Sequence, residues 1–250
     1  MRMVDLSHPW DIHTPGWVGY AGNKIYYAQN FQTNKVVAQR IETALHVGTH
    51  IDAPMHLSLN PKDIASLPLE RLVGEGVIID ISDQVGDWDE IKPEHILAKA
   101  DVKRGDILIY YTGYARHYTG AIAQDTERYF CLHPGGGKQL ADWIIEMELA
   151  WTGVDTGTAD HPMNTTIRDM RPDLRARYER HIEMPVEQRW PEEELFVMHR
   201  RPFMHDIVHV ENIGGDVEQV LNRRCRIGAF PWRFVGGEAA MCRVIAFLDE

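Results

Sequence analysis

Cysteine, positive charge and long apolar runs are scarce in this chain of 250 residues. Its three cysteines are scattered and form no CxxC pair, which argues against a disulfide framework and favours a reducing compartment. The formal net charge is -11, so no basic surface for nucleic acid is expected. No apolar run reaches the ~18 residues of a membrane helix, and the N-terminus carries no apolar signal segment. We expect a cytoplasmic protein that binds neither nucleic acid nor membrane.

Two familiar catalytic motifs are also missing. The sequence contains no Gly-x-Ser-x-Gly elbow, so a serine hydrolase would have no recognisable nucleophile. Residues 135–138 (Gly-Gly-Gly-Lys) do not make a phosphate-binding loop, because Leu132 and Gln139 stand where that motif needs glycine and serine or threonine. We expect a turn before a helix there.

The apolar pattern predicts an α/β or α+β domain around a mixed sheet, over residues 1–250 as a single domain. Strands are expected at residues 4–6, 25–28, 36–45, 77–81, 106–111, 149–154 and 243–248. Helices are expected at residues 93–100 and 138–147. Residues 167–194 are dense in arginine and glutamate and show no strand pattern. We predict a helical insertion there, covering the site or meeting a second subunit.

The most informative segment is residues 46–56, which read His-x-Gly-Thr-His-x-Asp-x-Pro-x-His. Neutral imidazole and carboxylate are common ligands of divalent metal ions. In an extended chain, His50 and Asp52 point to the same face, and His46 can join them if Gly48 lets the chain bend. The strand expected at residues 36–45 would present these ligands from a rigid edge. Three ligands leave an open site, beside which His56 could carry a proton.

Ten histidines lie outside this motif. His161, His199, His205 and His209 have acidic neighbours at Asp160, Asp206 and Glu211, and spacing alone does not choose second ligands among them. The others are expected to be loop or solvated residues: His8, His13, His95, His117, His133 and His181. The loop at residues 155–160 follows a predicted strand, which suits either a site or a plain turn.

The segment from His46 to His56 resembles the signature of the cyclase-family metal-dependent hydrolases, which include bacterial kynurenine formamidase and isatin hydrolase. Four other segments are similar to that family: Asp5-Leu6-Ser7, Pro15-Gly16-Trp17, Asp155-Thr156-Gly157-Thr158 and Arg243-Val244-Ile245-Ala246. The resemblance implies a swivelling β/β/α domain with a mixed sheet, and a homodimer or higher homo-oligomer. It covers most of the chain, although residues 167–194 depart from the compact formamidases.

The resemblance also implies roles for individual residues. His46, His50 and Asp52 would bind the first metal ion, and His56 would be the catalytic acid and base. His199 and Glu211, twelve residues apart, would complete a second metal site that Asp52 bridges, with His205 and His209 as rival ligands. One or two divalent ions are implied, zinc or manganese. Trp17 would lie on the substrate side, and an aromatic wall could comprise Trp17, Tyr20, Tyr26 and Phe31.

The expected activity is hydrolysis of a C–N bond in a small cyclic amide, a cyclic imide or an N-formyl arylamine, by metal-activated water. A lactone or ester hydrolase using the same chemistry stays open as an alternative. So does a non-catalytic metal-binding protein of the same fold, although structural zinc sites are normally closed by four protein ligands. A cupin-like oxygenase would also use two histidines and a carboxylate, but its motif continues differently.

Overall fold

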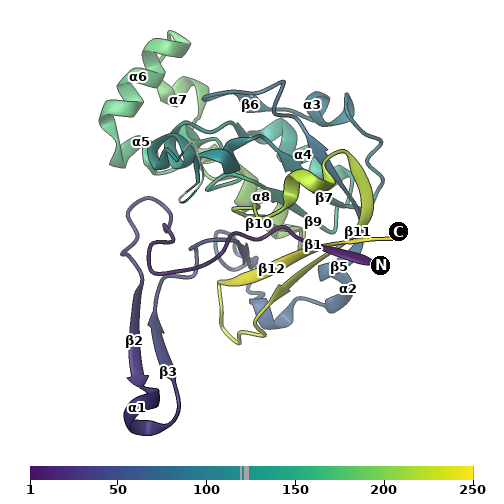
Figure 1. Cartoon of the computed structure of the whole chain (residues 1–250). Helices are drawn as coiled ribbons and strands as arrows, with labels where there is room; N and C mark the ends of the chain where they lie inside the picture. The colour runs from purple at the N-terminus through teal and green to yellow at the C-terminus, as the bar shows by residue number, and fades with distance from the viewer. Residues whose placement is uncertain (119, 121–123, 250) are drawn as a thin grey trace.

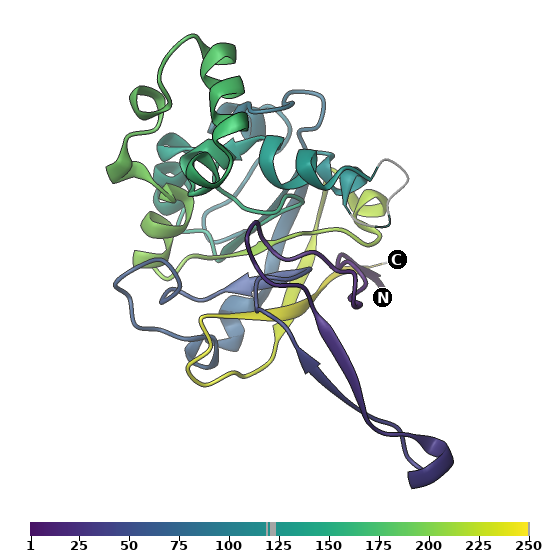
Figure 2. The same cartoon turned by 90° about the vertical axis from the view of Figure 1, so that its left-hand side faces the viewer.

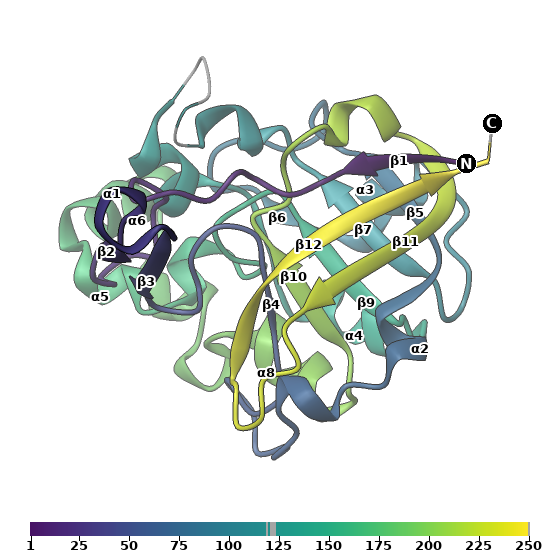
Figure 3. The ribbon, with the colours of Figure 1, turned by 60° about the horizontal axis from the view of Figure 1, so that its bottom comes forward.

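The computed structural model describes residues 1–118, 120 and 124–249, and one strongly curved sheet lies at its centre (Figures 1 and 3). Some neighbouring strands of this sheet are parallel and others antiparallel, so the sheet is mixed, as the sequence predicts. Strand β1 (Arg2–Asp5) pairs with β12 beside a closed ring of seven strands. In order of pairing, the ring consists of β4 (His50–Asp52), β10 (Val208–Glu211), β9 (Trp151–Val154), β7 (Ile107–Tyr111), β5 (Val73–Asp80), β11 (Arg223–Pro231) and β12 (Ala239–Leu248), which pairs again with β4.

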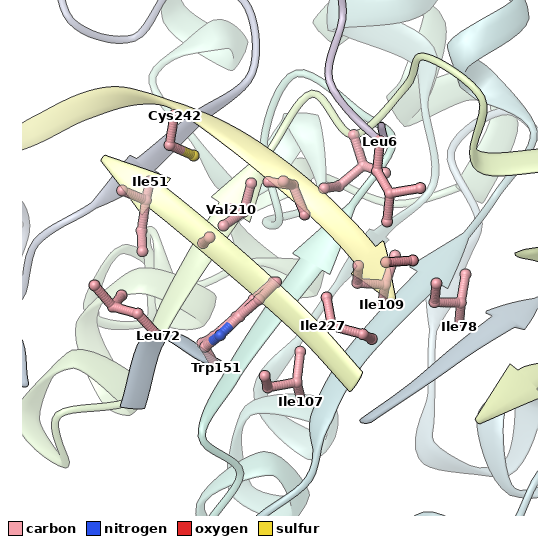
Figure 4. Close-up of a cluster of buried hydrophobic side chains, with 14 of the residues drawn as sticks. Leu6, Ile51, Leu72, Ile78, Ile107, Ile109, Trp151, Val210, Ile227 and Cys242 are labelled. Carbon is pink, nitrogen blue, oxygen red and sulfur yellow. The ribbon is translucent and has the colours of Figure 1, made fainter. Parts of the chain in front are cut away.

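The main apolar core lies inside this ring and takes side chains from every strand of it (Figure 4). On β7, Ile107 and Ile109 join this core, whereas Leu108 and Tyr110 belong to a second core outside the ring. This alternation is the two-residue period of a strand with both faces covered. A buried isoleucine contributes roughly 1.5–3 kcal/mol through burial, so the ring is a rigid frame for whatever its strands present.

The second core lies between the parallel strands and three helices, α3 (Pro93–Leu97), α4 (Lys138–Glu146) and α8 (Val197–Met204). Among the described residues, no helix has the length and apolar character needed to cross a bilayer. The remaining short elements are η1 (Ile64–Ser66), α2 (Leu69–Leu72), β6 (Glu90–Ile91), η2 (Tyr114–His117), η3 (Arg128–Leu132), β8 (Gly135–Gly136), η4 (Pro162–Asn164) and η6 (Val217–Val220).

Residues 167–194 carry helical structure at one end of the molecule (Figure 1): α5 (Ile167–Met170), α6 (Pro172–Ile182), α7 (Val186–Arg189) and η5 (Glu192–Glu194). Tyr178 and Trp190 from this segment pack with Trp88 and Tyr129 in a third apolar cluster. The Trp190 indole N–H donates to the Tyr178 hydroxyl over 2.9 Å. That this segment is an insertion stays a prediction.

A hairpin projects from the body of the molecule (Figures 1 and 2) and consists of β2 (Lys24–Gln29), α1 (Phe31–Asn34) and β3 (Ala38–Glu42). We call residues 24–42 the arm. Its two strands pair only with each other. Large apolar side chains on the arm face solvent, with exposed fractions of 70% for Tyr27, 65% for Phe31 and 57% for Val37.

The mixed α/β fold expected from the sequence is confirmed, and most predicted elements are found within a few residues. The expectation that the strand at residues 36–45 would present the metal ligands is wrong. That stretch forms β3 in the arm, because its apolar residues find no place in the closed ring. Two of the candidate ligands, His50 and Asp52, lie instead on the three-residue strand β4. Strands β10 and β11 and helix α8 were not predicted.

Candidate metal centre

Two short strands place four ligand-type side chains on one face of the sheet. In the antiparallel pair of β4 and β10, His50 lies opposite Glu211 and Ile51 lies opposite Val210. Ile51 and Val210 point into the core of the ring. Because side chains alternate along a strand, His50 and Asp52 on β4 share the other face with Glu211, and also with His209, which lies two residues earlier on β10.

Asp52 lies at the centre of this group and is fully buried. Its Oδ1 atom is 3.1 Å from His46 Nδ1 and 3.4 Å from His50 Nε2. Its Oδ2 atom is 3.4 Å from His199 Nε2 and 3.3 Å from His209 Nε2. The carboxylate therefore has one oxygen toward each of two histidine pairs, which come from segments about 150 residues apart in sequence.

A bend at Gly48 brings His46 back toward the strand. Gly48 has φ +70°, in the left-handed region where a Cβ atom is strained. An added Cβ would also lie 3.2 Å from both the Thr14 side chain and the Trp10 ring. The bend therefore requires glycine, as the sequence pattern predicts, and it lets His46 reach Asp52.

Glu211 and Asp160 fix the second pair of histidines. Glu211 Oε1 accepts a hydrogen bond of 2.8 Å from the Ala159 backbone N–H and lies 3.2 Å from His209 Nε2. Asp160 Oδ2 lies 2.6 Å from His199 Nδ1, and its Oδ1 accepts from the Met198 backbone N–H. Because Asp160 occupies Nδ1, the Nε2 atom of His199 is directed at Asp52.

The electrostatics of the centre keep its carboxylates ionised. Burial alone would raise the pKa of Glu211, but the hydrogen bond and charge of His209 lower it to about 2. Burial likewise opposes ionisation of Asp52, yet the charges of His46 and His50 hold its pKa well below the ordinary value. Burial works against protonation of His199, but the hydrogen bonds that its ring donates to Asp160 and Asp52 raise its pKa to about 10. Positively charged imidazoles thus balance the carboxylates, and a divalent cation would take over that role by replacing protons on the rings.

These residues fit a divalent metal ion. Both carboxylate oxygens of Asp52 and the Nε2 atom of His209 are buried and have no partner in hydrogen-bonding geometry, although nitrogen and oxygen ligands surround them. Ligand atoms of Asp52, His199, His209 and Glu211 lie within 4.8 Å of one another. Imidazole and carboxylate together suit zinc and manganese, among other ions. His46, His50 and Asp52 could hold one ion, and the later group a second, with Asp52 between them.

His56 lies at the rim of the centre, with 19% of its side chain exposed. Its ring centroid is 4.1 Å from that of His46 and 5.8 Å from that of His199. Glu238, from the loop before β12, lies against both rings at this rim, with Oε2 2.6 Å from His46 Nε2 and 2.8 Å from His56 Nδ1. The sequence analysis missed Glu238, since nothing in its neighbourhood marks it.

The aromatic wall expected from the sequence forms only in part. The Trp17 backbone N–H donates to the His46 carbonyl oxygen over 3.2 Å, which places this loop beside the centre. The Tyr20 ring lies 5.9 Å from the His46 ring and 6.1 Å from the Trp17 ring. Tyr26 and Phe31 lie on the arm, away from the centre (Figure 1).

The structure brings together the six residues expected to hold metal or carry a proton: His46, His50, Asp52, His56, His199 and Glu211. His209 joins His199 and does not replace it. His205 is exposed at the end of α8, and Asp160 and His209 are the further members of the group. The alternating Val-His-Val-Glu of β10 could have revealed His209, because it puts that side chain on the face of Glu211.

Two histidines expected to be solvated are buried, which corrects the sequence analysis. His133 is fully buried and His117 is 8% exposed. Burial lowers the pKa of His133 to about 4, so it is neutral. Their polar neighbours in sequence suggested a surface position, but His117 ends η2 and His133 directly follows η3, and both side chains are buried there. His161 is also fully buried and stacks on Trp190, outside the metal centre.

Comparisons with known proteins show a family and a fold that this chain shares. The sequence model of a family described as putative cyclase matches residues 4–161. A kynurenine formamidase from Bordetella petrii is 26% identical over 179 residues, which span 68% of this chain and 80% of that protein. Isatin hydrolase A from Labrenzia aggregata has a TM-score of 0.76 at 18% identity, covering 100% of this chain and 94% of that chain. A structure described as a potential metal-dependent hydrolase with cyclase activity has a TM-score of 0.67 at 19% identity, covering 100% of this chain and 98% of that chain.

Proposed function

The chain belongs to the putative cyclase family, and from this premise we propose that it is a metal-dependent hydrolase of a small molecule that contains a C–N amide bond. The substrate class would be an N-formyl arylamine, a cyclic amide or a cyclic imide. Similarity to a kynurenine formamidase supports the bond type. The observation that carries the proposal is the buried Asp52 carboxylate, whose two oxygens face two sets of ligands without a hydrogen bond of their own.

The residues that would hold the metal divide into two sets. His46, His50 and Asp52 form the first, as the motif predicts, and Asp52 with His199, His209 and Glu211 forms the second. A bound divalent ion would polarise the amide carbonyl and acidify an attacking water molecule. Asp160 and the Ala159 backbone N–H keep the second set oriented before any ligand arrives.

His56 would carry the proton. Its position supports this role, because the ring lies 5.8 Å from the His199 ring and is also partly exposed to solvent. An imidazole in this place can take a proton from water and return it to the departing nitrogen. Trp17 and Tyr20 would flank an aryl substrate on the same side.

We also propose a second copy of this chain as the partner. The arm exposes Tyr27, Phe31 and Val37. A separate patch on the body, which we call the body patch, exposes Phe230, Trp232, Phe234 and Val235, with Trp232 at 61% and Val235 at 80%. Two exposed apolar surfaces on one chain favour a two-fold homodimer that buries both.

One experiment tests the proposed activity. The purified chain is stripped of metal, reloaded with Zn²⁺ or Mn²⁺, and its metal content is measured by mass spectrometry. Hydrolysis of N-formyl arylamines, cyclic amides, cyclic imides and lactones is then followed by pH-stat. We expect one or two ions per chain and metal-dependent hydrolysis of at least one amide class, with His205→Ala as a matched histidine control. A chain that binds no metal and hydrolyses none of them would contradict the proposal, and turnover of lactones alone would redirect it to esters.

A further inference from the structure

We propose that Glu238 is a positioning residue that fixes two histidines at once: His46 as a metal ligand and His56 as the proton carrier. This inference rests on the proposed function for what the two histidines do. Glu238 lies near the C-terminal end of the sequence and belongs neither to the motif at residues 46–56 nor to the two sets of candidate metal ligands.

The backbone holds Glu238 against the motif. The Glu238 carbonyl oxygen accepts a hydrogen bond of 2.8 Å from the Ala53 N–H, and Ala239 lies directly opposite Asp52 in the pairing of β12 with β4. The start of β12 therefore runs alongside the strand that carries the ligands. Ala239 adds little bulk there, and the Glu238 side chain extends over the rim formed by His46 and His56.

The position of the proton on His46 follows from its neighbours. An ionised carboxylate only accepts hydrogen bonds, so the contact of 2.6 Å from His46 Nε2 to Glu238 requires the proton on Nε2. The Nδ1 atom of the same ring faces Asp52 at 3.1 Å and His50 at 3.2 Å. That is the atom a metal ion would bind, and a carboxylate behind the ring both orients a ligating histidine and makes it a stronger base.

The same oxygen sets the opposite tautomer on His56. Glu238 Oε2 lies 2.8 Å from His56 Nδ1, so Nδ1 carries the proton and Nε2 is the basic atom. Within the part of the chain that the structure describes, Glu238 is the one carboxylate within 4.0 Å of a His56 ring nitrogen. A single carboxylate thus prepares one ring to bind metal and the other to accept a proton. The two rings also pack together at 4.1 Å, so tilting one would disturb the other.

Tautomers and metal affinity test this role without any substrate. The Zn²⁺-loaded chain is labelled with ¹⁵N-histidine, and long-range ¹H–¹⁵N spectra assign the protonated nitrogen of each ring. We expect Nε2–H on His46 and Nδ1–H on His56. In Glu238→Ala, His56 should shift to a mixture dominated by Nε2–H, and the Kd for Zn²⁺ should rise about 10–100-fold.

Glu238→Gln should restore most of both properties, because its amide oxygen still accepts from the rings. Glu193→Ala, which removes an exposed glutamate elsewhere, should change neither. The inference is overturned if Glu238→Ala keeps both tautomers and a Kd within twofold of the parent chain. If the chain binds no Zn²⁺, the proposed function fails. The role of Glu238 is then still decided by comparing the His56 tautomer in the parent chain and in Glu238→Ala. A folded state is checked by circular dichroism of each variant.

Discussion

Globular proteins usually bury apolar side chains and expose charged ones, and the metal centre and the arm depart from this rule in opposite ways. The centre buries most of its charged and polar side chains, and the arm leaves large apolar ones in solvent. The centre is assembled from residues spread between His46 and Glu238, whereas the arm is one continuous stretch of residues 24–42. Buried ionisable groups persist where they are paired or bind a metal, and exposed apolar patches persist where a partner covers them. Both regions therefore indicate something that the single chain lacks.

The difference lies in how each region is completed. The side chains gathered around Asp52 all come from one chain, so a small ion would complete the centre. The arm leaves more than half of Tyr27, Phe31 and Val37 exposed, so another macromolecule would be needed to cover them. Metal binding at the centre should therefore respond to single substitutions that change charge. Association through the arm should respond to substitutions that change its exposed apolar area.

The largest effect should come from Asp52→Asn. This change removes the charge that both ligand sets share and keeps the side-chain shape. We expect metal content to fall to a small fraction of the parent level, and kcat/KM for any amide substrate to fall by roughly 10³ or more, since electrostatic stabilisation by a metal is lost. Metal analysis and initial rates measure this directly.

The exposed His205→Ala serves as the control for that experiment, because it removes an imidazole near α8 and outside the centre. Its metal content and rate should equal those of the parent. An Asp52→Asn chain that retains its full metal content would show that Asp52 is not the shared ligand. The buried charge of the centre could then not be explained by metal binding, and its comparison with the arm would fail.

His56→Ala should have the next largest effect. Loss of a general acid and base lowers kcat by typically 10²–10⁴-fold. Since His56 lies at the rim and not among the innermost ligands, metal content should stay at the parent value. Steady-state kinetics and metal analysis on the same sample give both numbers. Metal lost together with activity would make His56 a ligand, which its place in a group with His46 and Asp52 would also allow.

Much of the fold was predictable, because continuous apolar runs mark buried parallel strands such as Ile107–Tyr111. The first half of the centre was predictable for a similar reason, since His46, His50 and Asp52 are close in sequence and a short strand with a glycine bend fixes their geometry. Asp160 was noted as an acidic neighbour of the later histidines, but spacing did not predict its contact with His199 Nδ1. Glu238 was not predictable, because its place depends on the pairing of β12 with β4, a long-range event that no local pattern encodes.

The arm shows the opposite failure. Its strand-like composition predicts a strand correctly, yet the same composition suits a strand of the main sheet. The closed ring settles its partner, because β4 pairs with both β10 and β12, which leaves no free edge at β4 for β3 to join. A local pattern gives the type of element, and the tertiary structure decides its partner.

Charging the arm should break the dimer and leave the centre intact. In a chain with Tyr27→Asp and Val37→Asp, two exposed apolar groups become charged, and we expect the dimer dissociation constant to rise about 100-fold or more, equivalent to about 2.7 kcal/mol. Light scattering after size-exclusion chromatography measures the mass. Matched changes at exposed polar sites of the arm, Gln32→Asp and Asn34→Asp, should preserve the dimer. A parent chain that is monomeric at every concentration would show that the arm has another partner.

The smallest effect concerns a buried histidine outside the centre. His161 is fully buried and donates through Nε2 to the Trp88 carbonyl oxygen over 2.9 Å. Burial lowers its pKa to about 3, whereas carboxylate partners raise that of His199 to about 10. Burial without a carboxylate partner at His161 and burial with the hydrogen bonds to Asp160 and Asp52 at His199 therefore shift the pKa of the two imidazoles in opposite directions.

The sign of the pH dependence follows from this depressed pKa. Above the ordinary value of about 6.5, His161 is neutral in both states. As the pH falls below 6.5, the unfolded chain takes up a proton that the folded chain refuses until about pH 3, so stability is lost across that window. Between pH 7 and pH 5 this amounts to about 2 kcal/mol. Urea unfolding at both pH values should show a smaller loss in His161→Gln by that amount, and no change in the exposed control His13→Gln. An equal loss in the parent and in His161→Gln would mean that the imidazole takes up a proton while buried, and burial alone would then not separate core histidines from those of the centre.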